Sequence, residues 1–189
     1  FEDKDFDGFG NALSSLCLCE ETGTFSTTTV GDCNDLNPQI APGALETCNA
    51  LDDDCNGTID DDDSSGCLIR YRDFDGDGWG DVAETKCLCQ PVYPYTATAA
   101  GDCNDGSNQV FPGAVEICNS TDDNCNGLTD EDGASGCVPY FLDADGDGYG
   151  VTALTMCLCG AQGDWSATKG GDCDDSMATR SPGEPEVCD

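Results

Sequence analysis

The stretch DFDGDGWGDVAE, residues 73–84, has acidic side chains at its first, third, fifth, ninth and twelfth positions and a glycine at its sixth. Calcium prefers oxygen ligands, and a 12-residue loop can supply about six of them from its positions 1, 3, 5, 7, 9 and 12, with glycine at position 6 for the turn. The ligands expected on this pattern are Asp73, Asp75, Asp77, the carbonyl of Trp79, Asp81 and Glu84. The sequence therefore predicts a calcium-binding loop here.

This loop belongs to a repeat with a period of 70 residues, and all the cysteines fall on that period. They form the sets Cys17, Cys87 and Cys157; Cys19, Cys89 and Cys159; Cys33, Cys103 and Cys173; Cys48, Cys118 and Cys188; Cys55 and Cys125; Cys67 and Cys137. The chain thus divides into repeat 1 (residues 1–70), repeat 2 (residues 71–140) and repeat 3 (residues 141–189), which stops inside a recurring motif. This pattern favours a fragment of a longer array or a subunit whose last repeat a neighbour completes.

Three acidic motifs recur in the repeats. The first, D-x-D-x-D-G-x-G or close to it, comprises Asp3, Asp5 and Asp7; Asp73, Asp75 and Asp77; and Asp143, Asp145 and Asp147. The second, G-D-C-[ND]-D followed by P-G-x-x-E-x-C, comprises Asp32, Asn34, Asp35 and Glu46; Asp102, Asn104, Asp105 and Glu116; and Asp172, Asp174, Asp175 and Glu186. The third comprises Asp52, Asp54, Asn56, the Thr58 carbonyl, Asp60 and Asp63, and its second copy has Asp122, Asn124, Asn126 and Asp130.

Some copies lack the ligand expected at position 12. In the first motif that position is Ser14 in repeat 1 and Leu154 in repeat 3, so another carboxylate of the same repeat must complete the site. The candidates are Glu46, Glu116 and Glu186, each beside a Pro-Gly turn and a cysteine. In the second copy of the third motif, Glu131 or Asp132 must replace the ligand that Gly133 cannot supply. We expect three sites per full repeat and about eight calcium ions per chain.

Two other interpretations of the acidic motifs remain open at this stage. A run of Asp such as residues 60–63 is also typical of a solvated surface, and the Asp and Asn of the second motif could cap Asx turns. Magnesium prefers fewer carboxylates and more waters, whereas copper and zinc favour imidazole, thioether or thiolate ligands. The chain has no His and only Met156 and Met177, so calcium fits best.

Composition excludes a protein held together by apolar packing alone. The net charge is −33 on 189 residues, and Leu, Ile, Val and Phe together number 31. An unliganded chain of this charge repels its own compaction, so bound cations are expected. Nucleic acid is an unfavourable partner for such an acidic chain, and no apolar run reaches the length of a membrane span.

Sixteen cysteines indicate a disulfide-stapled protein of an oxidising compartment, extracellular or on the cell surface. The chain starts at Phe1 without a basic and apolar leader, which favours a mature or trimmed product. Zinc bound at the C-L-C pairs is a less favoured alternative, because zinc motifs usually have C-x-x-C spacing.

Disulfide connectivity stays open between two schemes. The favoured one pairs Cys19 with Cys33, Cys48 with Cys55 and Cys67 with Cys87, and leaves Cys17 and Cys188 for bonds between subunits. The rival scheme pairs Cys55 with Cys67 and makes two bonds among Cys17, Cys19, Cys33 and Cys48.

The expected fold is a small, disulfide-rich, calcium-stabilised repeat array, mostly loops with little regular secondary structure. Short strands are expected in residues 68–74 and 138–144 and around Cys87 and Cys157, and single helical turns in the three Pro-Gly segments. The sequons place N-linked glycans at Asn119 or, less favourably, at Asn56, where a sugar would crowd an ion.

The order of the motifs, D-x-D-x-D-G-x-G, G-D-C-N-D, P-G-A-x-E-x-C and D-D-x-C-N-G-x-x-D, resembles the bacterial "putative metal-binding motif" repeat of MopE-like surface proteins. Single loops are also similar to dockerin and thrombospondin type 3 calcium repeats. The resemblance implies extracellular, multi-copy modules. Some members bind copper, but this sequence lacks the His that such sites favour. The extra cysteines in C-L-C and at Cys67 and Cys137 imply a more heavily stapled version.

We therefore predict a non-enzymatic, calcium-binding structural repeat protein outside the cell, serving as a stalk, fibre or filament subunit that associates end to end. The alternative is an adhesion module whose outward-facing carboxylates bind a mineral or a receptor. No His and no G-x-S-x-G motif is present, which disfavours an enzyme. Neither nucleic acid nor membrane insertion is expected.

Overall fold

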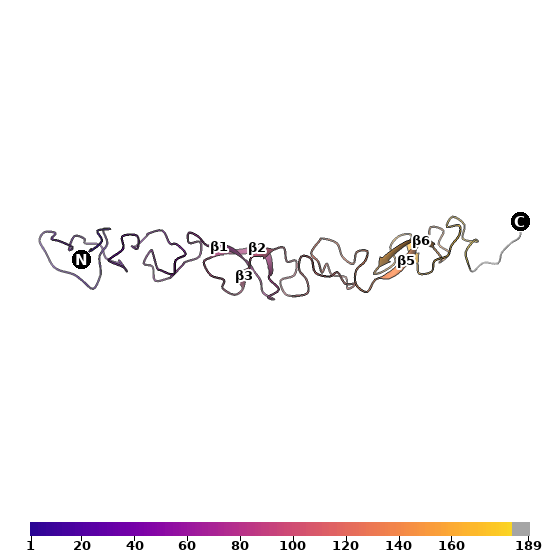
Figure 1. The fold of residues 1–189 in the computed structure, drawn as a ribbon, viewed down its shortest axis with the longest axis horizontal. Helices are drawn as coiled ribbons and strands as arrows, with labels where there is room; N and C mark the ends of the chain where they lie inside the picture. Colours follow the sequence, from indigo (N-terminus) through magenta and orange to yellow (C-terminus); the bar gives the residue numbers. More distant parts are fainter. Residues whose placement is uncertain (183–189) are drawn as a thin grey trace. The chain divides into compact units, whose positions relative to one another are not determined.

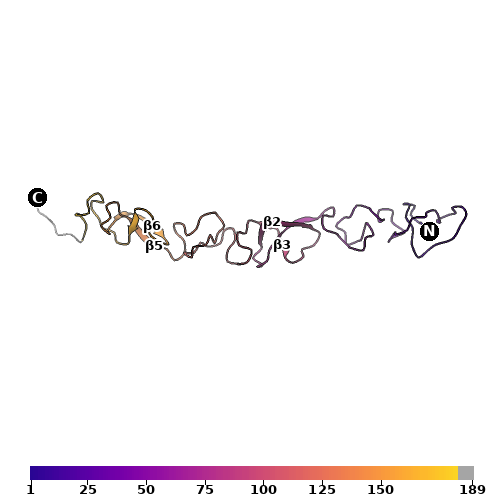
Figure 2. The same ribbon diagram turned by 180° about the vertical axis from the view of Figure 1, so that it is seen from behind.

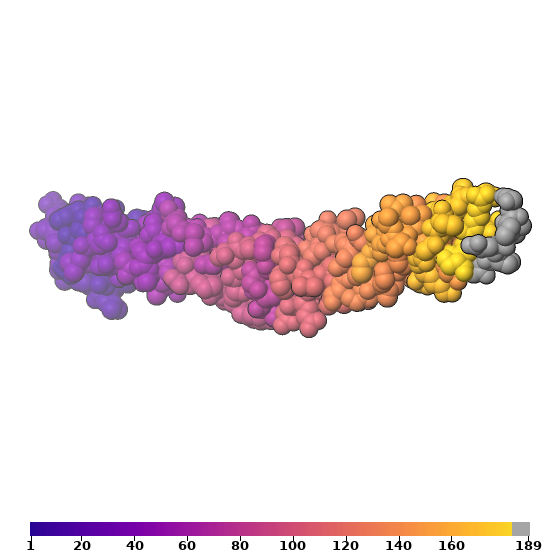
Figure 3. Space-filling view, turned by 45° about the vertical axis from the view of Figure 1, so that its right-hand side comes forward, coloured from indigo at the N-terminus to yellow at the C-terminus, as the bar shows by residue number. Residues whose placement is uncertain are grey.

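The computed structural model describes residues 1–182 and divides the chain into two compact units, unit 1 (residues 1–100) and unit 2 (residues 101–189). Within unit 1, the indigo and violet first repeat is followed by strands drawn in purple to magenta (Figure 1), and the space-filling view has the same order of colours along the chain (Figure 3). Unit 2 carries the rest of repeat 2 and repeat 3. Loops and turns make up most of both units.

Four strands lie where the alternating sequence predicts them, and three short strands, at residues 95–97, 99–100 and 165–167, were not expected. Unit 1 contains β1 (Leu68–Arg72), β2 (Trp79–Leu88), β3 (Tyr95–Ala97) and β4 (Ala99–Ala100) in the sheet order β3-β1-β2-β4. Unit 2 contains β5 (Val138–Leu142), β6 (Val151–Leu158) and β7 (Trp165–Ala167) in the order β6-β5-β7. Seen from either side (Figures 1 and 2), β1 and β2 form a hairpin with β3 beside it.

Each hairpin presents a first-motif loop at its end. β1 and β2 are antiparallel, with Leu68 opposite Leu88, and the register shifts between Tyr71 and Arg72. This β-bulge turns the chain into the loop of residues 73–78, where Gly78 has a φ of 96° that side chains with a Cβ rarely adopt. The hairpin therefore fixes the direction in which the aspartates of the loop project.

The expected single helical turns are not present. Among residues 1–182 no helix forms, and the segment PGALETC begins as a β-turn closed by the Ala44 amide on the Ala41 carbonyl at 2.9 Å. Gly43 has a φ of 84°, outside the helical region, and this conformation stops a helix. The third Pro-Gly segment lies almost entirely beyond the described residues, and no helix able to span a membrane occurs among those described.

The interior is more acidic than apolar. In the described part of the chain, eight buried residues are apolar and eleven are polar or charged, and no side chain is less than 2% exposed. Leu88, Leu158, Ile40 and Val110 are among the apolar ones. Apolar burial is therefore small, and the fold depends on covalent links and on whatever satisfies the buried carboxylates.

Among the described residues six disulfides staple the loops: in each unit one lies within a repeat and two join that repeat to the next. They are Cys33–Cys55, Cys48–Cys89 and Cys67–Cys87 in unit 1 and Cys103–Cys125, Cys118–Cys159 and Cys137–Cys157 in unit 2. The predicted small, disulfide-rich fold with short strands and little regular secondary structure is thereby confirmed. The bonds agree with an oxidising environment.

The favoured pairing scheme was right for Cys67–Cys87 and its counterpart, and wrong for the other bonds. Cys33 pairs with Cys55 instead of Cys19, since the turns of the second and third motifs bring their Cα atoms to 5.6 Å. Cys48 reaches Cys89 in the next repeat instead of Cys55. The rival pairing of Cys55 with Cys67 is wrong for the same reason.

Cys17, Cys19 and Cys173 are free and exposed among the described residues, although Cys19 and Cys173 were expected in disulfides. Their expected partners are bonded elsewhere, Cys33 to Cys55 and Cys159 to Cys118. Cys188 lies outside the described residues.

Candidate metal centre

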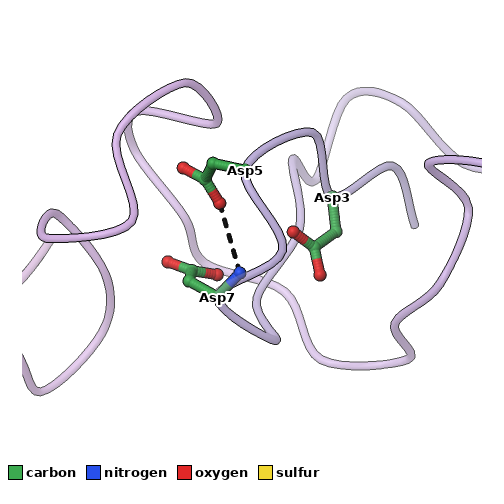
Figure 4. A group of neighbouring side chains, drawn as sticks. All are labelled: Asp3, Asp5 and Asp7. Atoms are coloured by element: carbon green, nitrogen blue, oxygen red, sulfur yellow. Dashed lines mark hydrogen bonds between the residues drawn. The ribbon is translucent and has the colours of Figure 1, made fainter.

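The first-motif aspartates of repeat 1 converge. Asp3, Asp5 and Asp7 each offer a carboxylate oxygen, and these oxygens lie within 4.8 Å of one another (Figure 4). Asp3 Oδ1 accepts a hydrogen bond from the Phe6 amide at 2.7 Å, and Asp5 Oδ1 accepts one from the Asp7 amide at 3.3 Å. These Asx-type bonds wrap the loop around its own carboxylates, which a tight turn with positive φ at Phe6 and Gly8 makes possible.

Aspartates of the second motif join the same group. The Lys4 amide donates to Asp35 Oδ1 at 3.0 Å, and Asp32 and Asp35 are both buried. Burial first, and then the charges of Asp7, Asp5 and Asp35, raise the pKa of Asp32. Burial and the neighbouring Asp7 likewise raise the pKa of Asp5. The first and second motifs of repeat 1 thus form one composite cluster: Asp3, Asp5, Asp7, Asp32 and Asp35.

Repeat 3 has the same composite cluster, formed by Asp143, Asp145, Asp147, Asp172 and Asp175. Oxygens of Asp145, Asp147 and Asp172 lie within 4.8 Å of one another, as do those of Asp143, Asp145 and Asp175. The Ala144 amide donates to Asp175 Oδ1 at 2.8 Å, as Lys4 does in repeat 1. Burial is the largest cause of a raised pKa at Asp145, followed among charges by Asp147.

The two composite clusters differ at one position. In repeat 1 the Lys4 ammonium lies 3.3 Å from Asp35 Oδ2 and 3.3 Å from Glu2 Oε2, and the contact with Asp35 raises the pKa of Lys4. Repeat 3 has Ala144 at that position. Asp35 of the first cluster therefore has the Lys4 ammonium beside it. Its counterpart Asp175 has no such cation at position 144, because Ala144 is uncharged.

Several oxygens in these clusters are buried without a donor. Among residues 1–182 no hydrogen-bond donor reaches the buried Oδ2 atoms of Asp5, Asp7, Asp32, Asp75, Asp145, Asp147 and Asp172. A buried carboxylate oxygen without a partner is costly, and folded proteins rarely retain one unless an ion or water satisfies it. Groups of converging, unsatisfied carboxylates have the chemistry of a site for a hard cation.

The loop of residues 73–84 follows the calcium pattern only in its first half. Asp73, Asp75 and Asp77 offer oxygens within 4.8 Å of one another. Glu84 does not join them, since its carboxylate lies 3.5 Å from the Arg72 guanidinium. The carboxylate of Asp81 accepts the Ala83 amide at 2.8 Å.

The departure has a local cause: β2 begins at Trp79, so the chain runs on extended instead of curling back. Positions 9 and 12 of the loop, Asp81 and Glu84, lie along this strand.

The second-motif aspartates of repeat 2 lie in unit 2. Asp102 is buried and accepts the Asn104 amide at 2.8 Å, and Asp105 is half-buried.

The third motif forms a second kind of group. Oxygens of Glu46, Asp52 and Asp54 lie within 4.8 Å of one another. Glu46 Oε2 accepts the amides of Asp53 and Asp54 at 3.0 and 3.2 Å, and Oε1 accepts the Asp60 amide at 3.2 Å. We call residues 46–60 with these contacts the closed loop. Glu116 makes the same three bonds to Asp123, Asn124 and Asp130 at 3.0, 3.2 and 3.0 Å.

The sequence suggested that Glu46, Glu116 or Glu186 completes the first-motif loop of its repeat. Glu46 and Glu116 do not do so in the structure. Glu46 lies in the closed loop, and Asp32 and Asp35 lie beside Asp3, Asp5 and Asp7 instead. Glu186 lies outside the described residues. Sequence distance gave no way to see this pairing of the first and second motifs, since 31 residues separate Lys4 from Asp35.

The remaining third-motif residues serve the turns around the closed loop. Asp60 Oδ1 accepts the amides of Asn49 and Ala50, each at 2.9 Å. Asp61, rather than Asp63, contacts the Asn56 side chain at 2.6 Å. Asp63 is exposed, and its amide donates to the Cys87 carbonyl.

The second copy shows which residue replaces Gly133. Glu131 Oε1 accepts the side-chain amides of Asn124 and Asn126 at 2.8 and 2.7 Å, while its Oε2 is buried without a donor among the described residues. Asp132 instead accepts the Cys157 amide at 2.8 Å. Glu131 is thus the residue that takes the missing position, and Asp122 and Asp130 bind loop amides as in the first copy.

The middle position of the second motif faces away from the composite clusters. Asn34 and Asn104 are exposed, and their backbone amides donate to Asp32 and Asp102 in Asx turns. In repeat 3 the Asp174 carboxylate binds Arg180 at 2.9 Å. Turn capping and cluster formation thus occur together in this motif.

Both sequon asparagines use their side-chain nitrogens inside the protein. Asn56 Nδ2 donates to Asp54 and Asp61, and Asn119 Nδ2 donates to both carboxylate oxygens of Asp123 at 3.2 and 3.1 Å. A glycan on either would replace one of the hydrogens that these bonds use.

Sequence reasoning missed a pair of buried structural aspartates. Asp53 is 5% exposed and accepts the Thr47 amide and hydroxyl and the Asn49 side-chain amide, which lowers its pKa, Thr47 contributing most. Asp123 is 3% exposed in the second copy. The only signal in the sequence was a second consecutive Asp whose position does not fit the alternating ligands.

The described chain thus combines disulfide-stapled loops with groups of converging carboxylates. Three segments match the family titled Cu-binding_MopE and described as "putative metal-binding motif": residues 32–61, 102–131 and 172–189. The motif order predicted this match, which occurs once in each of the three repeats. The matched segments hold the second and third motifs, so the first motif lies outside them. No curated protein and no solved structure matches the chain.

Proposed function

We propose that this chain is a calcium-binding structural repeat protein that works outside the cell. The observation that carries the proposal is the set of buried, converging oxygens without donors at Asp5, Asp7 and Asp32 and at Asp145, Asp147 and Asp172. A cation at each composite cluster would satisfy these oxygens and reduce the repulsion that raises the pKa of Asp5, Asp32 and Asp145.

The donor set supports calcium over the copper in the family's title. Every side-chain donor that the composite clusters bring together is a carboxylate oxygen. Copper prefers imidazole, thioether or thiolate, and the chain has no His. Clusters built from five carboxylates also suit calcium better than magnesium, which keeps several waters.

A structural role follows from how the repeats are joined. Each described junction between repeats is closed by two disulfides and a strand pairing. Cations within repeats and disulfides between them would give a stalk, fibre or filament subunit that resists proteolysis. The proposal assigns no catalytic activity, since general acid–base chemistry would have no His to use.

Metal titration tests the proposal. We expect calorimetry and elemental analysis to show calcium binding with little competition from magnesium or copper. Since the first and second motifs share one cluster in repeats 1 and 3, fewer than about eight ions should bind per chain. Asp145→Asn should weaken binding, whereas Asp164→Asn, an exposed control of equal charge change, should not. Preferred binding of copper, or no calcium binding, would refute the proposal.

An adhesion or mineral-binding module is the second candidate. The net charge of −33 and exposed carboxylates such as Glu20 and Glu21 favour it. It predicts few tightly bound ions and strong adsorption of the calcium-saturated protein to a calcium mineral. The structural proposal predicts several bound ions and weak adsorption, so the two measurements together discriminate.

A further inference from the structure

Two junctions in the chain are built on one template. In unit 1 the segment of residues 46–72 packs on β2: Cys48 bonds Cys89, Cys67 bonds Cys87, and β1 pairs along β2. The Asp63 amide also donates to the Cys87 carbonyl at 2.9 Å. Unit 2 repeats these features with Cys118–Cys159, Cys137–Cys157, the pairing of β5 with β6, and the Gly133 amide on the Cys157 carbonyl at 2.9 Å.

In repeat 1 the residues that correspond to β2, residues 9–18, have no covering segment and form no strand. Leu88 is 7% exposed and Leu158 4% exposed, whereas their counterpart Leu18 is 45% exposed. Cys17 and Cys19, the counterparts of Cys87 and Cys89, are free and exposed. The same sequence positions are therefore covered and bonded twice and left open once.

The open face has the shape of a docking site. A cavity of about 370 Å³ lies there, lined among others by Phe1, Leu16, Leu18, Cys19 and Phe25. Leu16 is 56% exposed. We call Phe1, residues 16–19 and Phe25 the receiving face. Leu18 between two thiols matches Leu88 between Cys87 and Cys89, whereas Leu16 takes the position at which Lys86 pairs with Asp62.

We propose that the receiving face binds a further repeat of this kind, through a segment equivalent to residues 46–72 that adds a strand and forms two specific disulfides. The template sets the register: the Cys48-type thiol pairs with Cys19 and the Cys67-type thiol with Cys17. The inference rests on the proposed structural role, and it names the kind of partner and the bonds through which such a protein would assemble.

The covalent step is an ordinary thiol–disulfide exchange. For each bond, a thiolate attacks a small-molecule disulfide such as oxidised glutathione and releases one thiol. The partner thiolate then attacks the mixed disulfide and releases the second. Two protein thiols become one disulfide, and the two electrons and two protons lost are recovered in two small-molecule thiols.

The experiment uses the full chain and a synthetic peptide of residues 46–72 carrying Cys55→Ser, mixed with reduced and oxidised glutathione. Cys17 and Cys19 share one tryptic fragment, residues 5–70, so unreduced digests are sequenced by tandem mass spectrometry. Backbone cleavage between the two cysteines should place Cys48 of the peptide on Cys19 and Cys67 on Cys17. Cys173 is free and exposed in the same chain and serves as the internal control. Because docking raises the effective concentration, linkage to Cys19 should exceed linkage to Cys173 by roughly tenfold or more.

Single-cysteine peptides check the register. A peptide with Cys67→Ser should link to Cys19, and one with Cys48→Ser should link to Cys17. Exchanged partners, equal linkage to Cys173, or a Cys17–Cys19 bond that excludes the peptide would overturn the proposal. These outcomes are separate from metal binding, because a chain that binds calcium but fails this assay would retain the proposed function and lose only the docking face.

Discussion

The composite cluster and the closed loop of repeat 1 contain similar numbers of carboxylates and treat them in opposite ways. In the closed loop, Glu46, Asp52 and Asp54 accept hydrogen bonds on every carboxylate oxygen, all from groups of the loop itself. In the composite cluster, Asp5, Asp7 and Asp32 each keep a buried oxygen that no described donor reaches. The two regions thus have similar numbers of acidic residues, but only the composite cluster needs a cation to satisfy its oxygens.

The difference shows that the local arrangement of N–H groups, rather than the number of acidic residues, decides whether a carboxylate has hydrogen-bond donors. Backbone amides solvate the closed loop from within, since the glutamate lies at the centre of three N–H groups. The composite cluster joins two distant segments, and its amides are used mostly in Asx turns on one oxygen of each carboxylate. We therefore expect the closed loop to be ordered without metal and the composite cluster to order only with it.

Chelation gives the largest test of this contrast. Excess EDTA should lower the thermal stability of the chain strongly, because a ligand at about 1,000 times its Kd stabilises by about 4 kcal/mol per site. Hydrogen exchange should accelerate at the amides of Lys4 and Asp7, while those of Asp53, Asp54 and Asp60 stay protected. Equal loss of protection in both regions would contradict the contrast.

Removing the disulfide between the two regions should have the next largest effect. Cys33 follows Asp32 of the composite cluster and Cys55 lies in the closed loop, with 22 residues between them. The Cys33→Ser/Cys55→Ser variant should lose about 3 kcal/mol of stability. Calcium binding should weaken in repeat 1, whereas the matched Cys103→Ser/Cys125→Ser variant should leave the composite cluster of repeat 1 intact.

Substituting the central glutamate tests the closed loop alone. Glu46→Gln removes a buried charged acceptor and should cost about 1–3 kcal/mol in the free energy of unfolding. Exchange should accelerate at the amides of Asp53, Asp54 and Asp60. The number of bound calcium ions should not change, and the loss of one ion would identify Glu46 as a ligand instead.

The effect of Asp145→Asn on the melting temperature should have opposite signs without and with calcium. Without metal the variant should raise the melting temperature, because it removes a charge from a group whose burial and acidic neighbours raise its pKa. With calcium it should lower the melting temperature and weaken affinity on the order of tenfold or more. Asp164→Asn should shift neither state, and a shift of the same sign in both states would argue against a cation at this cluster.

The pH dependence of stability should differ between the two regions, and this is the smallest of the expected effects. The raised pKa of Asp5, Asp32 and Asp145 means that the metal-free folded chain takes up protons more readily than the unfolded chain. Its stability should therefore rise as pH falls from neutral through those raised values. Asp53 behaves oppositely: its lowered pKa contributes stability above its ordinary value, which is lost as pH falls through the folded value.

Melting curves in EDTA across pH therefore should show a gain in mild acid and a loss in strong acid. Saturating calcium should abolish the gain, because protons and cations compete for the same oxygens. A monotonic fall from neutral pH without metal would contradict the raised pKa values of the cluster.

The sequence by itself determined the repeat, the first-motif loops and the longer strands. The period of 70 is read directly from the sequence. The D-x-D-x-D-G motif and the alternation in residues 68–74 each act over a few residues, where spacing and glycine directly set the backbone. The loop conformation of Asp73, Asp75 and Asp77 and the bond between Cys67 and Cys87 followed from such local rules.

Only the tertiary structure decided which distant groups meet. It placed Asp32 and Asp35 beside Asp5, turned Glu46 onto backbone amides, and joined Cys48 to Cys89 across a repeat boundary. No local pattern encodes these contacts, because several carboxylates and cysteines of each repeat have the right chemistry and only chain folding brings one choice within bonding distance.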